Sequence, residues 1–145
     1  MYLVDTNVVS AGAPSRLAPP ELVAWMDEHS KLLFLSAVTV AEIEAGVAKL
    51  RREGATRKAE ELAAWLETVL HLYGDRVLAF DTPTARIAGA LLDRARGQGQ
   101  APGFADIIIA ATAERHSLTI LPRNLRHFAP LGAPALDPFE ALPPA

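Results

Sequence analysis

The sequence predicts an α/β protein with a central parallel sheet of four to five strands flanked by helices. Two observations predict this α/β layout: short apolar, β-prone runs recur along the chain, and segments with helical periodicity separate them. Strands that alternate with helices in this way pair in parallel. Because the chain has 145 residues, 50% of them hydrophobic, we expect a single domain over 1–145.

Four apolar runs are the expected strands, and each is bounded by residues typical of turns or helix caps. They span 1–4, 32–35, 77–80 and 118–121. The Pro/Ala-rich tail over 132–145 can add an edge strand around 134–136 before its end frays. The sheet is therefore expected to hold four strands, or five with the tail.

The segments between these strands place apolar residues on one face at helical spacing. A short helix should follow residue 5, and longer helices are expected over 21–30, 38–50, 55–73, 82–95 and 104–116. Gly54 separates two consecutive helices, which we expect to form a hairpin. The run over 97–102 is rich in glycine and glutamine and is expected to be a loop.

Composition limits the partners and the chemistry. The net charge of −3 gives no overall attraction for a polyanion, so a nucleic-acid role needs local basic residues or metal ions. The chain has no cysteine, which excludes disulfides, thiolate metal sites and a cysteine nucleophile. No apolar stretch approaches the ~20 residues that a bilayer crossing requires. We therefore expect a cytoplasmic protein with no signal peptide and no membrane partner.

Acidic residues stand where strands end and helices begin. The four acids at such positions are Asp5, Glu42, Asp81 and Asp106. Because the carboxyl ends of parallel strands share one edge of a sheet, these side chains can meet there. Asp106 is the most informative of them, since its neighbours over 104–111 are otherwise apolar and an unpaired buried carboxylate is costly.

Such a cluster points to a metal site. Carboxylates a few ångströms apart repel one another unless a cation neutralises them. Oxygen ligands in a chain without cysteine favour Mg²⁺ or Mn²⁺. Mg²⁺ keeps several waters, which leaves positions for a phosphodiester oxygen and an attacking water. The pattern therefore suits hydrolysis of a nucleic-acid backbone.

Taken one at a time, these acids also have plain structural interpretations. Asp5 and Asp81 are typical of helix caps or turns, and Glu42 can be a solvated residue or an acid that satisfies a helix dipole. The basic residues over 49–58 are interspersed with glutamate, which favours a solvated helix face over an RNA-binding surface. Only the set as a whole favours a metal site.

Histidines and aromatic residues give weaker signals. No histidines have the spacing of zinc ligands, and His127 is expected to be structural although it could face the site. Trp25, Trp65 and Phe104 are expected in the core or at an interface, because aromatic residues make up only 6% of the chain.

Four sequence blocks together resemble the PIN-domain ribonucleases, specifically the VapC toxins of the FitB-like branch. The blocks span 2–10, 35–43, 105–113 and 121–128, and the first reads YLVDTNVVS. Each block alone is weak, but the four in this order are specific and cover nearly the whole chain. The resemblance implies a parallel-sheet α/β fold and a metal-dependent endoribonuclease that uses Mg²⁺ or Mn²⁺.

The resemblance also implies roles for individual residues. Carried over by position, the metal ligands and catalytic residues are Asp5, Glu42 and Asp106, and the supporting residues are Asn7, Ser10 and Asn124. Asn7 and Ser10 would donate hydrogen bonds that support Asp5, and Asn124 would stand at the fourth polar position. Further residues that could line the site are Thr6, Asp81, Arg123 and His127.

Two positions depart from the family pattern. Pro122 stands where a threonine is usual, which puts a hydroxyl contact in doubt. Asn124 stands where other PIN branches have a fourth acid, which favours one tightly held ion, with a second recruited by the substrate.

The family further implies an RNA substrate and a role as the toxin of a type II toxin–antitoxin system. Its partners would be a small cognate antitoxin protein and a second copy of the chain, and the pair could assemble as a hetero-oligomer on operator DNA. The apolar helical hairpin over 38–73 is a candidate dimer or antitoxin surface.

Other functions fit the residues less well. A haloacid-dehalogenase-like phosphatase with Asp5 as nucleophile needs a second aspartate where this chain has Asn7, and a receiver-like phosphoacceptor needs paired acids and a late lysine. The main alternative is a catalytically silent PIN module that only binds RNA or a partner protein. Buried acids without a metal would destabilise such a module.

Overall fold

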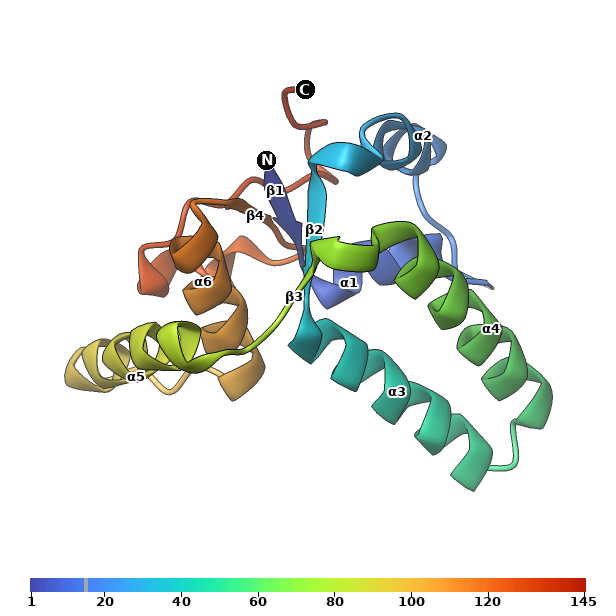
Figure 1. Cartoon of the computed structure of the whole chain (residues 1–145), viewed down its shortest axis with the longest axis horizontal. Coiled ribbons are helices and arrows are strands. Elements are labelled where there is room, and N and C mark those ends of the chain that lie inside the picture. The colour runs from blue at the N-terminus through green and yellow to red at the C-terminus, as the bar shows by residue number, and fades with distance from the viewer. Residues whose placement is uncertain (15) are drawn as a thin grey trace.

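The computed structural model describes residues 1–14 and 16–145, and a parallel sheet lies at its centre (Figure 1). The strands are β1 (Tyr2–Val4), β2 (Leu33–Ser36), β3 (Val77–Leu78) and β4 (Thr119–Leu121). Their order across the sheet is β3-β2-β1-β4, and every pairing is parallel. In the register, Leu3 lies between Phe34 of β2 and Ile120 of β4. The expected α/β class is confirmed, and β1 is an interior strand of the sheet.

Helices cover both faces of the sheet. They are α1 (Thr6–Val9), α2 (Pro20–Glu28), α3 (Ala37–Arg52), α4 (Thr56–Tyr73), α5 (Thr82–Gly97) and α6 (Phe104–His116). Helices α5 and α6 lie on one side of the sheet, and α1, α2 and α4 lie on the other (Figure 1). The expected hairpin forms from α3 and α4, and Gly54 makes its turn with φ +80°, a conformation that side chains other than glycine rarely adopt.

Alternation along β1 produces two hydrophobic cores. Leu3 packs into the core shared with α5 and α6, whereas Tyr2 and Val4 pack into the core shared with α1, α2 and the α3–α4 hairpin. Successive side chains of a strand point to opposite faces, so a strand covered on both faces is apolar throughout. This explains why Tyr2–Val4 is buried without interruption.

The largest differences from the expected strands are at β3 and in the tail. β3 ends at Leu78 rather than at residue 80, because its partner β2 ends at Ser36, where the chain turns into α3. The tail adds one bridge, Ile120 to Ala135, where a fifth strand was expected around 134–136. Pro134 has no N–H group to extend that pairing.

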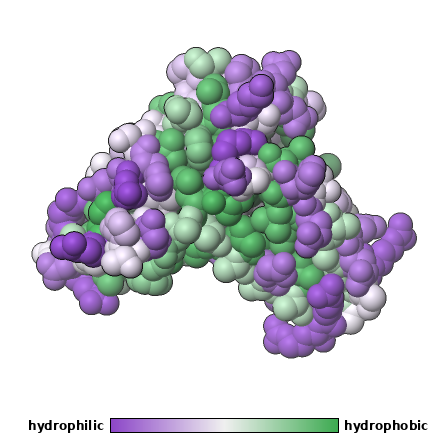
Figure 2. All heavy atoms as spheres, viewed as in Figure 1, coloured by the Kyte–Doolittle hydropathy of each residue, from purple (hydrophilic) through white to green (hydrophobic). Residues whose placement is uncertain are grey.

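Polar and apolar residues are unevenly distributed over the surface of the fold. Apolar residues gather in the middle of the face seen in Figure 2, between the outer helices, which are mostly hydrophilic. Among residues 1–14 and 16–145 no helix is both long and apolar enough to cross a membrane.

Candidate active site

Three acids approach one another at the carboxyl end of β1. Asp5 directly follows this strand, and its backbone N–H donates to Leu121 O at 3.1 Å, which keeps it in line with β4. Only 6% of Asp5 is exposed. Glu42 lies in the second turn of α3, and Asp106 lies in the first turn of α6. The topology therefore brings together acids that are far apart in the sequence.

The pKa values of Asp5 and Asp106 record this proximity. Burial raises the pKa of Asp5 from 3.8 to about 6, the Thr6 N–H opposes the rise, and the negative charges of Asp106 and Glu42 add to it. Burial also raises the pKa of Asp106, and the charge of Glu42 raises it further while His127 lowers it. The charges of Glu42 and Asp106 thus act on Asp5, and the charge of Glu42 acts on Asp106, which indicates that the three carboxylates face a common space.

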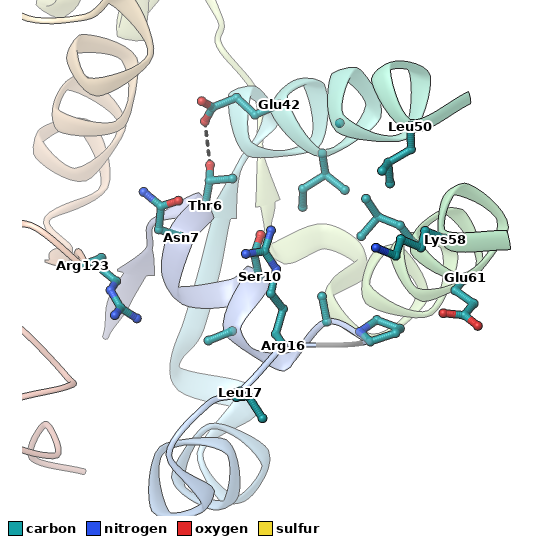
Figure 3. A pocket seen from close by; sticks show the side chains of 16 residues that line it. Thr6, Asn7, Ser10, Arg16, Leu17, Glu42, Leu50, Lys58, Glu61 and Arg123 are labelled. Atoms are coloured by element: carbon teal, nitrogen blue, oxygen red, sulfur yellow. Dashed lines mark hydrogen bonds between the residues drawn. The ribbon is translucent and has the colours of Figure 1, made fainter. Parts of the chain in front are cut away.

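Thr6 joins the N-terminal segment to α3. Its hydroxyl donates to Glu42 Oε1 at 2.6 Å and lies 3.0 Å from the hydroxyl of Thr39, which is buried (Figure 3). Glu42 is otherwise exposed, so this contact fixes the direction in which its carboxylate points. Thr6, which the sequence ranked below the three acids, is the residue that orients one of them.

His127 and Asn124 extend the site from the other side. His127 Nδ1 lies 3.4 Å from Asp106 Oδ2, and Asn124 Nδ2 lies 3.4 Å from His127 Nε2. Asn124 Oδ1 accepts the Arg126 N–H at 3.0 Å and so caps the short 3₁₀ turn Leu125–His127. This turn directs the His127 ring toward Asp106. Sequence spacing could not reveal the contact, because it depends on a single irregular turn.

Asn7 and Ser10 do not make the hydrogen bonds expected of them. In the part of the chain that the structure describes, neither side chain is bonded to Asp5, whose Oδ1 accepts the Thr6 N–H at 2.8 Å instead. Asp5 caps α1 in this way, so its carboxylate turns back over the helix start. Asn7 and Ser10 line a neighbouring cleft.

Asp81 does not join the other acids, contrary to the expectation that all four would meet. It follows β3, an edge strand, and caps α5 by accepting the Thr84 N–H at 3.1 Å and the Thr84 hydroxyl at 2.6 Å. These hydrogen bonds lower its pKa. Because β2 separates β3 from β1, Asp81 remains an exposed helix cap.

An open cleft of about 960 Å³ extends from Glu42 along the α3–α4 hairpin (Figure 3). Its inner end is lined by Thr6, Asn7 and Glu42, with Arg123 at one side. Farther out, Leu50, Lys58 and others from α3 and α4 line it. The cleft therefore combines a polar inner end, which carries Glu42, with a partly apolar wall.

The acids suit a hard divalent cation, although their side chains do not form a complete coordination site. Within residues 1–14 and 16–145, no three histidine, aspartate or glutamate side chains stand close enough to enclose an ion as they are placed. Mg²⁺ needs only one or two direct carboxylates and keeps its remaining waters. The donor set of Asp5, Glu42 and Asp106 fits that requirement, because a cation would offset the burial and the repulsion that together raise the pKa of Asp5.

The family model for the PIN domain matches residues 2–129. The chain belongs to the PIN-domain family. Among characterised members, it is 40% identical over 143 residues to the Toxin FitB of Neisseria gonorrhoeae, a match that covers 97% of this chain and 99% of that one. It is 34% identical over 145 residues to VapC ribonuclease Y4jK of Sinorhizobium fredii, with 97% and 99% covered.

A solved PIN-domain structure agrees with this assignment. The crystal structure of FitAcB from Neisseria gonorrhoeae matches with a TM-score of 0.81 and 39% sequence identity, over 95% of this chain and 98% of that one. The family resemblance drawn from the four sequence blocks is thus confirmed, as is the PIN-like fold.

Proposed function

We propose that this PIN-domain protein is a metal-dependent endoribonuclease and the toxin of a type II toxin–antitoxin system. The observation that carries the proposal is the convergence of Asp5, Glu42 and Asp106 at the end of an interior strand, where the charges of Asp106 and Glu42 add to the raised pKa of the buried Asp5. Relatives named as a toxin and as a ribonuclease, each matched over nearly its whole length, support the same function.

Asp5, Glu42 and Asp106 would hold Mg²⁺, for which Mn²⁺ could substitute. When bound, such an ion supplies Lewis acidity and lowers the pKa of a coordinated water. The chain's own residues orient the reacting groups. Thr6 holds Glu42 Oε1, which leaves Glu42 Oε2 to accept a proton from the attacking water, and His127 holds Asp106 from the opposite side.

The cleft supports an antitoxin as the protein partner. An inhibitory segment with apolar side chains would pack along the α3–α4 wall, and a basic side chain would reach the inner end near Glu42. A toxin that acts on cellular RNA needs such a partner to be held inactive. Glu42→Gln should therefore weaken antitoxin binding in calorimetry, whereas Glu44→Gln on the same helix should not.

An exposed aromatic pair supports self-association. Phe80 and Phe104 are 38% and 58% exposed, and their rings meet edge to face with centroids 6.3 Å apart. The sequence favoured the core or an interface for Phe104 over a base-stacking role, and its exposure excludes the core. We expect a homodimer that covers this pair, so Phe104→Ser should shift sedimentation toward the monomer.

The deciding experiment is cleavage of a structured RNA by purified, antitoxin-free protein with Mg²⁺ or Mn²⁺. Cleavage should disappear with EDTA and in a folded Asp5→Asn variant. Persistence of cleavage in either control would contradict the assignment of the acids. If folded protein neither cleaves RNA nor binds Mn²⁺, the alternative of a silent binding module replaces the nuclease.

A further inference from the structure

The C-terminal segment over 134–144 folds back onto the sheet beside the candidate site. Ile120 N–H donates to Pro134 O at 2.8 Å, and Leu136 N–H donates to Ile120 O at 3.0 Å. Near the end of the segment, the Tyr2 hydroxyl donates to Pro144 O. Contacts at both of its ends therefore fasten this segment to β1 and β4.

Between these anchors, Phe139 packs against an arginine of the site. Phe139 is partly buried against the core that contains Tyr2 and Val4, and its N–H is held by Asp137 Oδ1 at 2.8 Å. The guanidinium carbon of Arg123 lies over the Phe139 ring, 4.2 Å from the centroid. A cation on a ring face at this distance is attracted by the negative face of the ring.

Arg123 retains its capacity to bind an anion. It lines the same cleft as Thr6, Asn7 and Glu42. Among residues 1–14 and 16–145 it forms no salt bridge, although several carboxylates belong to the neighbouring site. The contact with the ring engages the guanidinium carbon and uses none of the five N–H donors of the group, which can therefore donate to phosphate oxygens.

We propose that the C-terminal segment is part of the RNA-binding edge: Phe139 is a positioning residue that fixes Arg123 so that its guanidinium binds a phosphate of the RNA backbone beside the cleavage site. The proposal rests on the nuclease function above and assigns to Arg123 the role of a cation beside the acids of the site. Carboxylates repel a phosphodiester, so a held arginine at the rim supplies attraction where the net charge of −3 does not.

The test is binding of a short, labelled single-stranded RNA of mixed sequence, measured by anisotropy at several salt concentrations. The reference protein has Asp5→Asn, so that the probe is not cleaved. In this background Arg123→Gln should weaken binding and reduce the slope of log affinity against log salt by about 0.7, the value for one phosphate contact on a single strand. Phe139→Leu should weaken binding about three- to fivefold. Phe139→Tyr keeps an aromatic ring and should bind RNA as tightly as the reference protein does.

A double-mutant cycle separates positioning from a general structural role. If Phe139 acts through Arg123, Phe139→Leu should have no further effect once Arg123→Gln is present. Leu142→Ala, an exposed site of the same segment, is the matched control and should bind as the reference does. Arg123→Lys keeps the charge but loses the planar guanidinium, so it should weaken RNA binding about as much as Phe139→Leu does. This variant tests the proposal independently if Phe139→Leu folds poorly.

Each outcome distinguishes the two hypotheses. Additive effects of Phe139→Leu and Arg123→Gln, or equal loss in Leu142→Ala, would overturn the positioning role while leaving the nuclease proposal intact. Absence of RNA binding by the Asp5→Asn reference, together with absence of cleavage by the unmodified protein, would overturn the nuclease proposal and this inference with it.

Discussion

Asp5 and Asp81 occupy the same local motif but have opposite properties. Each follows a strand, precedes a threonine and caps the next helix by accepting a backbone N–H. Yet burial and neighbouring acids raise the pKa of Asp5 to about 6, whereas the Thr84 hydrogen bonds lower the pKa of Asp81. The local sequence therefore does not decide which aspartate belongs to a site.

Position in the sheet accounts for the difference. β1 lies between β2 and β4, and the helices that bring Glu42 and Asp106 converge on its carboxyl end. β3 is at the edge, where water reaches Asp81. A carboxylate at an interior strand end is desolvated and meets other acids, whereas one at an edge has only its own helix as partner.

The largest expected contrast is in catalysis. Asp5→Asn should lower kcat/KM for RNA cleavage by more than about 100-fold, since even indirect supports of a metal site cost 10–100-fold when removed. Asp81→Asn should leave kcat/KM unchanged. Cleavage assays on the two purified variants measure the contrast, and a similar loss in both would show that the two aspartates are not functionally distinct.

Stability should depend on pH in opposite directions at the two positions. A carboxyl with a raised pKa holds its proton more tightly when folded, so ionising Asp5 destabilises the metal-free protein as pH rises from about 4 to 6. The rise from 3.8 to about 6 corresponds to at most about 3 kcal/mol of unfolding free energy above that range. Asp81, with its lowered pKa, stabilises the protein at neutral pH and loses this contribution as the pH falls.

Urea unfolding in EDTA across this pH range measures both effects. Asp5→Asn should remove the destabilisation at neutral pH and unfold at a higher urea concentration than the unmodified protein. Asp81→Asn should retain the destabilisation at neutral pH. The interpretation fails if Asp5→Asn is less stable than the unmodified protein at pH 7 and without metal.

The threonines that follow the two aspartates offer a smaller contrast. The Thr6 hydroxyl holds Glu42 at 2.6 Å, so Thr6→Val should reduce cleavage about tenfold, as expected for a residue that orients a metal ligand. Thr6→Ser keeps the hydroxyl and should retain most activity. Thr82 follows Asp81 as Thr6 follows Asp5, and Thr82→Val should have no effect on cleavage. The kcat/KM values of the three variants show whether the Thr6 hydroxyl matters for cleavage.

The smallest expected effect is at His127. Its contact with Asp106 is partly exposed and 3.4 Å long, so His127→Gln should reduce cleavage only about two- to fivefold. His116→Gln, which changes an exposed histidine at the end of α6, the helix that carries Asp106, serves as the control. A loss above about 100-fold would mean that His127 takes part directly in the reaction.

Much of this arrangement could be predicted from the sequence. The periodic segments predicted every α-helix and the four strands among the described residues, and the strand ends predicted where Asp5, Glu42 and Asp106 would meet. Their catalytic roles remain predictions. Asp106 was the most informative acid because a charge at the start of an otherwise apolar helix needs a partner, and the structure places it beside His127 and the other two acids.

Other features of the site depended on the tertiary fold, which no local stretch of sequence specifies. The exclusion of Asp81 required the order of the strands, since four strand ends look alike until one strand is known to lie at the edge. The turn of His127 toward Asp106 depends on a short irregular segment, and the stacking of Arg123 on Phe139 depends on how the tail returns to the sheet. Tertiary packing determines these contacts.

The most direct test of the account is a calorimetric titration of the metal-free protein with Mn²⁺, made on the unmodified chain, Asp5→Asn and Asp81→Asn. We predict that the unmodified chain and Asp81→Asn bind Mn²⁺ with the same affinity and that Asp5→Asn does not bind it measurably. Equal binding by all three folded proteins, or loss of binding in Asp81→Asn alone, would contradict the claim that the interior strand end holds the metal.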